Sequence, residues 1–207
     1  MVYFIYLCRV KTKAEITSEF IIKTVAPVFN KKGYSGTSMS DITHATGLTK
    51  GAIYGNFTDK NELAVKSFVY TINKVAQKIE DSISVHQSSL AQLYAISAFY
   101  KDYYQFTFDF GGCPILNIGI DANHQNPDLL AKVKKAIKNL QNNMSTIIDR
   151  GIENQEIKPT VDSKLYARRI FSMIEGGIFV ATMLNDKSYM EDLTVTIDHL
   201  IDQELKN

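Results

Sequence analysis

Several residue types that mark a particular chemistry are scarce in this sequence of 207 residues. It contains no tryptophan, two cysteines, four prolines and four histidines. Cys8 and Cys113 lie far apart, which argues against a disulfide scaffold and favours a reducing, cytoplasmic setting. The histidines are dispersed and do not take the Cys/His spacing of a metal site, so we expect neither a metal nor a cofactor.

Long apolar runs and catalytic groupings are also missing. No stretch approaches the roughly 20 apolar residues that span a bilayer, so no membrane partner is expected. The apolar start, residues 1–8, lacks the basic segment and cleavage site of a signal peptide, and we interpret it as an arm without a catalytic role. We find no nucleophile–base–acid grouping and no phosphate-binding loop, which argues against an enzyme.

The sequence does contain apolar residues at helical spacing along most of its length. Hydrophobic residues make up 45% of the chain, enough for a packed core without disulfides. No alternating pattern predicts a strand. We therefore predict an all-α fold, with a compact helix-turn-helix unit of three helices over residues 11–65 and a larger helical body over residues 66–207. The expected helices cover residues 11–32, 39–46, 50–56, 60–83, 88–107, 115–121, 127–150, 162–184 and 188–205.

Charge is divided unevenly between these two parts. Residues 1–60 carry eight Lys/Arg and four Asp/Glu, whereas residues 61–207 carry fifteen and eighteen, although the whole chain has a net charge of +1. A basic head on an acidic body suits contact with nucleic-acid phosphates from one end. Because such splits also arise by chance, the asymmetry alone does not identify the partner.

Three helix starts fall close together near the N-terminus. Thr37–Asp41, Thr49 and Asp59–Glu62 each offer a capping side chain for a new helix. Such tight turns are typical of a helix-turn-helix. A small core should hold the two short helices across a turn centred on Gly47. We expect this core to consist of Phe29, Ile42, Ala45, Leu48, Ile53, Phe57 and Leu63.

The order and spacing of these elements strongly resemble the N-terminal domain of TetR-family transcriptional regulators. The stretches that carry the resemblance are Phe29–Tyr34, Thr37–Ile42 and Thr43–Leu63, and it covers about residues 15–65. It implies that residues 11–65 are a DNA-binding domain, that residues 66–207 bind a ligand and dimerise, and that the partner is a double-stranded DNA operator.

In that family the second short helix enters the major groove of DNA. The start of this helix suits the role, because Gly51 is small and the N–H groups after Thr49 favour a phosphate. The resemblance implies base-edge contacts from Lys50, Ala52 and Asn56. It implies phosphate contacts from Thr37, Ser38, Tyr54 and Lys60. The predicted DNA-binding residues are thus Thr37, Ser38, Thr49, Lys50, Gly51, Ala52, Tyr54, Asn56 and Lys60.

An aromatic-rich segment lies in the body. Residues 94–110 contain eight Tyr and Phe side chains, more than one core-facing stripe of a helix requires. Aromatic walls bind apolar or aromatic molecules, and tyrosine hydroxyls orient them. We therefore predict a pocket for a small-molecule effector; the alternative is that these rings simply fill the core. The expected pocket residues are Tyr94, Phe99, Tyr103, Tyr104, Phe106, Cys113 and Phe171.

The resemblance further implies a homodimer formed by the last two long helices. In the first of them Gly176 and Gly177 permit close approach of helices, although each glycine costs about 1 kcal/mol against alanine. A packing role explains that cost, and the alternative is a helix buried within its own chain. The predicted dimer interface is Phe171, Ile174, Gly177, Ile178 and Ala181.

The implied function is that of a homodimeric DNA-binding transcriptional regulator, a repressor released from its operator by a small, largely apolar or aromatic molecule. Two alternatives remain open. Cys113 precedes a short helix whose N-terminus can lower a thiol pKa, so the protein could be a redox-responsive regulator. It could also be a ligand-binding protein without DNA activity.

Overall fold

The computed structural model describes residues 11–207, except for the side chains of residues 106–110 and 124. The predicted arm and Cys8 lie outside the described residues. Within residues 11–207 the chain is helical without a β-strand, which confirms the all-α fold class. The helices are α1 (Lys13–Gly36), α2 (Met39–Thr46), α3 (Lys50–Tyr54), α4 (Lys60–Ile83), α5 (Ser89–Phe110), α6 (Pro114–Gln125), α7 (Pro127–Glu153), α8 (Ser163–Leu184), α9 (Ser188–Leu200) and the π-helical turn η1 (Ile201–Leu205).

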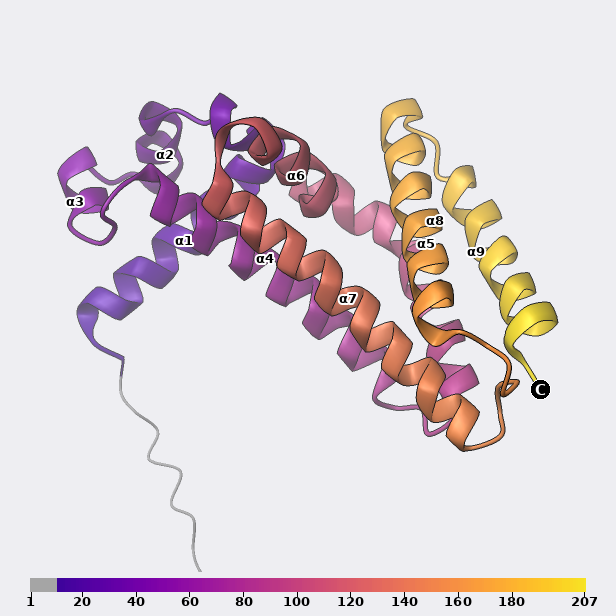
Figure 1. Cartoon of the computed structure of the whole chain (residues 1–207). Helices are drawn as coiled ribbons and strands as arrows, with labels where there is room; N and C mark the ends of the chain where they lie inside the picture. Colours follow the sequence, from indigo (N-terminus) through magenta and orange to yellow (C-terminus); the bar gives the residue numbers. More distant parts are fainter. Residues whose placement is uncertain (1–10) are drawn as a thin grey trace, which may run out of the picture.

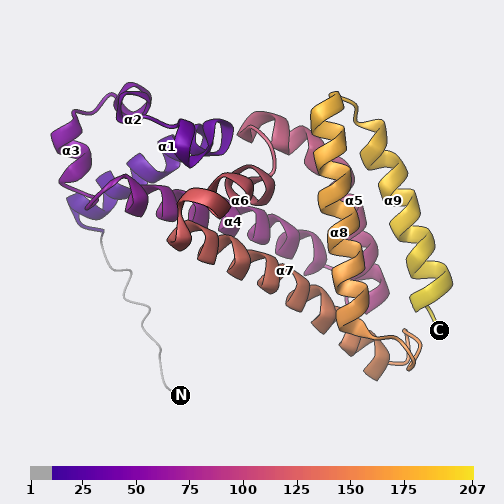
Figure 2. The same ribbon diagram turned by 45° about the horizontal axis from the view of Figure 1, so that its top comes forward.

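These helices form an elongated molecule with two distinct ends (Figure 1). Helices α1, α2 and α3 make up one end, which we call the N-terminal end, and α8 and α9 stand at the other. The long helices α4 and α7 run beside each other between the two ends (Figure 2). The expected boundary between residues 65 and 66 falls inside α4, so one continuous helix connects the N-terminal end with the body.

The helices of the N-terminal end begin where side chains satisfy the free N–H groups of the first turn. Thr12 caps α1, and Ser38 and Asp41 form a capping box at α2. At α4, Asp59 accepts a hydrogen bond over 2.7 Å from the backbone N–H of Glu62. The helix starts predicted at residues 39, 50 and 60 are therefore confirmed.

Several helix ends differ from the prediction, and three of them have a clear local reason. Helix α1 continues past residue 32 to Gly36, with a break at Gly33, whose φ of +73° suits a glycine. Helix α3 ends two residues early because the Asn56 side chain takes the Ala52 carbonyl that the backbone N–H would otherwise reach. Helix α6 continues beyond residue 121 until Asn126, whose extended backbone precedes a proline.

One continuous apolar core runs from the short helices into the body. In the N-terminal end, Ile42, Ile53 and Phe57 are buried as predicted, but Ala45 is exposed. Thr46 replaces it, because a residue one turn after Ile42 lies on the same face of α2. The buried Thr46 hydroxyl has a hydrogen-bond partner, because it donates to the Ile42 carbonyl oxygen over 2.8 Å.

Helix α6 and the turn before it tie the body to the end of α1 through hydrogen bonds. The Asn30 side chain donates to the Gly112 carbonyl oxygen over 2.8 Å, and the Asn117 side chain donates to the Asn30 carbonyl oxygen over 3.0 Å. Further along, the backbone N–H of Ser35 donates to the Asp121 carboxylate over 2.8 Å. Helix α2 begins directly after this segment, so these hydrogen bonds lie close to the start of α2.

Candidate nucleic-acid interface and internal cavities

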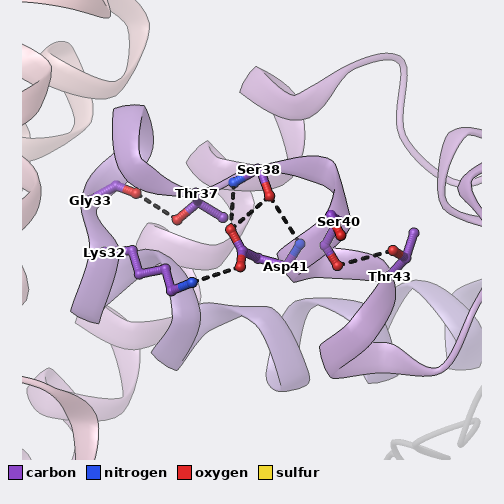
Figure 3. Close-up of polar contacts among 7 residues, drawn as sticks. All are labelled: Lys32, Gly33, Thr37, Ser38, Ser40, Asp41 and Thr43. Atoms are coloured by element: carbon purple, nitrogen blue, oxygen red, sulfur yellow. Dashed lines mark hydrogen bonds and ion pairs between the residues drawn. The ribbon is translucent and has the colours of Figure 1, made fainter.

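Helix α2 is held by a group of contacts at its first turn (Figure 3). The Ser38 hydroxyl donates to an Asp41 carboxylate oxygen over 2.8 Å and accepts from the Asp41 backbone N–H over 3.1 Å. The Lys32 ammonium, from α1, pairs with the other carboxylate oxygen over 2.6 Å. Lys32 and Ser38 together hold the pKa of Asp41 well below its usual range, so this carboxylate remains charged at neutral pH.

One predicted phosphate contact is corrected by the structure. Thr37 is fully buried, and its hydroxyl donates to the Gly33 carbonyl oxygen over 2.6 Å (Figure 3). Thr37 therefore joins α1 to α2 and is not available to DNA. Its neighbour Ser38 is exposed and stays a candidate contact at this edge.

Helix α3 is short and lies at the tip of the N-terminal end (Figure 1). Thr49 caps it, since its hydroxyl accepts from the Ala52 backbone N–H over 3.2 Å. Lys50 is exposed, and its ammonium lies 5.8 Å from the centre of the Tyr54 ring, which is 40% exposed. A positive charge and a phenol hydroxyl therefore share the outer surface of α3.

Two other predicted DNA contacts, Gly51 and Asn56, differ in how far the fold already engages them. A Cβ added to Gly51 would meet nothing closer than the Thr49 hydroxyl at 4.0 Å, so the fold itself does not require glycine there. The Asn56 amide is engaged at both ends: it donates to the Ala52 carbonyl oxygen over 2.9 Å and accepts from the Ser18 hydroxyl over 3.0 Å. Asn56 thus attaches α3 to α1, and one amide N–H remains for a base.

Lys60 lies at the start of α4, partly buried. Its ammonium is 4.4 Å from the centre of the Tyr34 ring, at cation–π distance. Burial lowers the pKa of Lys60. Because the ring already holds the ammonium, a contact with a phosphate requires this side chain to turn outward.

A cavity of about 330 Å³ lies inside the body between α4, α5, α7 and α8. Its walls are mostly apolar and aromatic, and include Ile79, Ile96, Tyr100, Met144, Ile147 and Phe171. Glu80, Gln92 and Arg150 also line it, and the Arg150 guanidinium donates to the Gln92 side-chain oxygen over 2.6 Å. This volume and lining suit one small organic molecule.

Part of the predicted pocket lies away from this cavity. The Tyr94 hydroxyl donates to Asp202 over 2.7 Å, and the Tyr104 hydroxyl donates to Asn185 over 2.9 Å, so both rings tie α5 to the C-terminal segments. Phe99 does not line the cavity. The side chain of the predicted Phe106 lies outside the described residues.

Other aromatic residues do line cavities. Phe171 lines the 330 Å³ cavity as predicted, and Tyr103 and Cys113 line a much smaller one next to it. Tyr100 lines both, although it was not among the predicted pocket residues. The spacing of Ile96, Tyr100 and Tyr103 places these three on one face of α5, and this periodicity could have identified Tyr100.

Glu175, which no sequence pattern had singled out, borders the smaller cavity. It accepts a hydrogen bond from the Cys113 thiol over 3.4 Å and lies among Tyr100 and Tyr103. Burial raises the pKa of the Glu175 carboxyl from its ordinary 4.5 to about 7. The body therefore contains a half-buried acid whose pKa lies near neutral pH.

The environment of Cys113 contradicts the basis for a redox sensor. The thiol is buried, and burial together with the Glu175 carboxyl raises its pKa well above the ordinary value. The backbone N–H groups at the start of α6 lower the pKa, but by less. A reactive cysteine needs an accessible thiolate, and this site disfavours one.

The predicted dimer residues on α8 face the interior of their own chain. Ile174, Ile178, Ala181 and Phe171 are buried within the chain. A Cβ added to Gly177 would lie 2.6 Å from the Leu193 side chain, so this glycine permits the contact between α8 and α9. The structure therefore corrects this set: the alternative of a helix buried within its own chain holds for these residues.

The opposite face of α8 is exposed and apolar. Phe179 is 46% exposed and Met183 is 63% exposed, and a Cβ added to Gly176 would meet nothing within 4 Å. On α9, Val195 is 69% exposed. We call these four residues the outer face of α8 and α9. Exposed apolar side chains of this kind are typical of surfaces that bind a partner.

Neither a membrane span nor a metal site is found in the described part of the chain. Among the described residues, no helix combines the length and the apolar character that a membrane span needs. Nor does any group of three or more His, Cys, Asp and Glu side chains in residues 11–207 have the arrangement of a metal site.

Comparison with known sequences identifies both parts of the chain. A family model described as bacterial regulatory proteins, tetR family, matches residues 21–66. A second model, described as Tetracyclin repressor-like, C-terminal domain, matches residues 89–197, about half of the chain. The two matches follow one another in the order predicted for the helix-turn-helix unit and the body.

Known structures and proteins extend the similarity over most of the chain. A TetR-family transcriptional regulator from Cytophaga hutchinsonii is 34% identical, covers 95% of this chain and 98% of its own, and superposes with a TM-score of 0.90. A TetR regulator from Chloroflexus aurantiacus is 32% identical, with coverages of 94% and 98% and a TM-score of 0.89. The fatty acid metabolism regulator protein of Bacillus subtilis is 22% identical over 82% of this chain and 84% of its own.

Proposed function

The chain belongs to the TetR family of transcriptional regulators, and from that premise we propose that it is a homodimeric repressor released from its operator by a small, largely apolar molecule. Its relatives are DNA-binding regulators and not enzymes. In this proposal residues 11–65 bind the operator, and residues 66–207 bind the effector and form the dimer.

The outer surface of α3 is the observation that carries the proposal. It presents Lys50 and Tyr54 to solvent beside Gly51, a glycine that the fold itself does not require. A missing side chain at this point lets the backbone approach a groove closely. In our proposal Lys50 and Ala52 contact base edges, while the other contacts position the helix on phosphates. These positioning residues are Ser38, Thr49, Tyr54 and Lys60.

The dimer requires a surface on the body, and the outer face of α8 and α9 supports one. Pairing of this face with a second copy would cover Phe179, Met183 and Val195 and bring Gly176 close to the partner helix. A two-fold axis there would present two α3 helices to one side of a DNA duplex. Successive major grooves then require the helices to stand one turn apart, roughly 34–36 Å.

Two helices connect the cavity with the N-terminal end and could transmit a structural change from a bound effector to α3. Helix α4 lines the cavity with Ile79 and starts next to the helix-turn-helix. Helix α6 borders the smaller cavity at Pro114 and Ile115 and holds the end of α1 through Asn117 and Asp121. A ligand that favours a different packing of these helices changes the spacing of the α3 pair, by no more than its differential affinity for the two states.

Replacement of Lys50 by alanine tests the proposed reading surface. A duplex selected from genomic fragments by the purified protein serves as the operator, and fluorescence anisotropy reports binding. We expect Lys50→Ala to cost about 1–3 kcal/mol for each half-site, because the ammonium that would meet a base edge is then absent from both protomers. Lys135→Ala, which removes the same charge from an exposed position on α7, is the matched control and should bind like the wild type.

The remaining alternative, a ligand-binding protein without DNA activity, makes the opposite prediction. Such a protein would show no salt-sensitive preference for any duplex, and Lys50→Ala would behave like Lys135→Ala. That result would contradict the proposal that the outer surface of α3 binds DNA.

A further inference from the structure

The cavity in the body ends near a carboxyl group that the fold leaves without a counter-charge. Glu175 receives a hydrogen bond from the Cys113 thiol over 3.4 Å, and in the described part of the chain no cationic side chain offsets its charge. Withdrawal of a carboxylate from water without such a partner is costly. An acid kept there at a cost is a candidate for binding a ligand.

Two cavities adjoin one another close to this acid. Tyr100 and Leu140 line both the 330 Å³ cavity and the small cavity that Glu175 borders, so these two side chains form the partition between them. Phe171, one turn before Glu175 on α8, already lines the larger cavity. The small cavity has a volume of about 10 Å³, so Tyr100 and Leu140 must move before a charged group in the larger cavity can reach the carboxyl group.

We propose that the effector is an organic monocation on an apolar body, an alkyl or aryl ammonium, with its charged group held by Glu175. This inference names the ligand class of the proposed repressor and rests on that proposed function. The walls at Ile96 and Met144 remove the apolar body from water. Tyr100 and Tyr103 line the small cavity beside Glu175, so their aromatic rings can attract the cation while Glu175 supplies the opposite charge.

The charges at the other side of the cavity do not select an anion. Arg150 and Glu80 both line the larger cavity, and both residues are exposed to water. Charges of opposite sign in water contribute little net binding energy. Among the residues that line the two cavities, Glu175 is the charged group that burial affects.

Three probes of one chain length separate charge from apolar burial. We would titrate the full-length protein with octyltrimethylammonium, octanol and octanoate in a calorimeter. The cation should bind about tenfold more tightly than octanol, and octanoate more weakly than octanol. Glu175→Gln should remove the preference for the cation, whereas Glu153→Gln, at an exposed position near the end of α7, should keep it.

Binding of the cation should also depend on pH. The titratable groups that face Glu175 are Tyr100 and Tyr103 from α5 and Cys113 at the start of α6, and burial raises the pKa of all three. They stay neutral near pH 7, so the carboxyl alone changes charge there. Affinity for octyltrimethylammonium should therefore rise as the pH increases through about 7, the pKa of Glu175.

A second variant keeps the test valid if glutamine disturbs folding. Glu175→Asp retains the charge and should retain a preference for the cation over octanol, and thermal melts of both variants report folding. Equal binding of the three probes overturns the inference. So does an unchanged cation preference in folded Glu175→Gln, or a preference for octanoate that Arg150→Gln removes.

Addition of the same probes to the protein–operator complex distinguishes this inference from the proposed function. If octanoate releases the duplex and the cation does not, the repressor stands and the cationic effector is overturned. If the cation binds through Glu175 but releases no duplex, the ligand class is supported and the proposed release by an effector fails.

Discussion

The two ends of the molecule hold their polar side chains in opposite ways. At the starts of α2 and α3 the contacts join neighbours in sequence and lie at the surface, as between Ser38 and Asp41 or between Thr49 and Ala52. In the body they join distant helices, and the Cys113–Glu175 contact spans 62 positions. The helix starts of the N-terminal end are therefore specified by the local sequence, whereas the contacts of polar side chains in the body depend on how its helices pack.

Two carboxyl groups show what this difference does to charge. The Lys32 ammonium and the Ser38 hydroxyl lower the pKa of Asp41, so it is always ionised at neutral pH. Burial raises the pKa of Glu175 to about 7, so its charge depends on pH and on any cation that approaches. One acid stabilises the start of a helix, and the other can respond to a ligand.

The largest effect is expected from a charge placed on the outer face of α8 and α9. Phe179→Asp would bring two unpaired charges together at the two-fold axis, at a cost of roughly 3 kcal/mol or more. We expect a monomer by analytical ultracentrifugation and an absence of operator binding. Val85→Asp changes a side chain that is 73% exposed at the far end of α4 and should leave the dimer intact. A dimeric Phe179→Asp protein would place the interface elsewhere.

The next effect sharpens the contrast between the two acids. Because its folded pKa is raised, Glu175 contributes stability that is fully present below about pH 4.5 and is lost as the pH rises through about 7. The glutamine in Glu175→Gln does not titrate. The free energy of unfolding of this variant should therefore exceed that of the wild type by an amount that grows with pH, from about pH 4.5 to above 7, to about 3 kcal/mol. Urea unfolding at several pH values measures it. The same pH dependence in both proteins would contradict the buried-acid assignment.

The contrast between the ends also explains which features the sequence could predict. A capping box is a pattern of four residues, so the start of α2 at Met39 followed directly from Ser38 and Asp41. The early end of α3 escaped prediction because it depends on the side chain of Asn56. Local sequence patterns therefore located α3 and placed only its end two residues too late.

The body shows the limit of such reasoning. Both faces of α8 are apolar, so helical periodicity cannot tell Ile174 and Ile178, which face the core, from Phe179 and Met183, which face solvent. Glu175 was missed for a related reason. Its neighbours come from α5 and from the start of α6, and no local pattern brings these segments together.

A smaller effect tests whether the N-terminal end is held by its local caps. Ser38→Ala removes the hydroxyl that caps α2 and should lower the free energy of unfolding by about 1 kcal/mol. Ser40→Ala, at an exposed position inside α2, should be neutral or slightly stabilising because alanine is the better helix former. Thermal melts of both variants provide the comparison. Equal decreases in stability would mean that α2 is held by packing and not by its cap.

The smallest effect concerns Lys60, which lies where the two ends join. Its ammonium is held 4.4 Å from the Tyr34 ring and must turn outward to reach a phosphate, so part of the binding energy is spent on leaving the ring. We expect Lys60→Ala to weaken binding to all duplexes alike and to reduce the slope of log affinity against log salt by about one for each phosphate that the side chain neutralised. Titrations at several salt concentrations, with operator and unrelated duplex, measure both quantities. A weakening confined to the operator would instead make Lys60 a residue that reads bases, as we propose for Lys50.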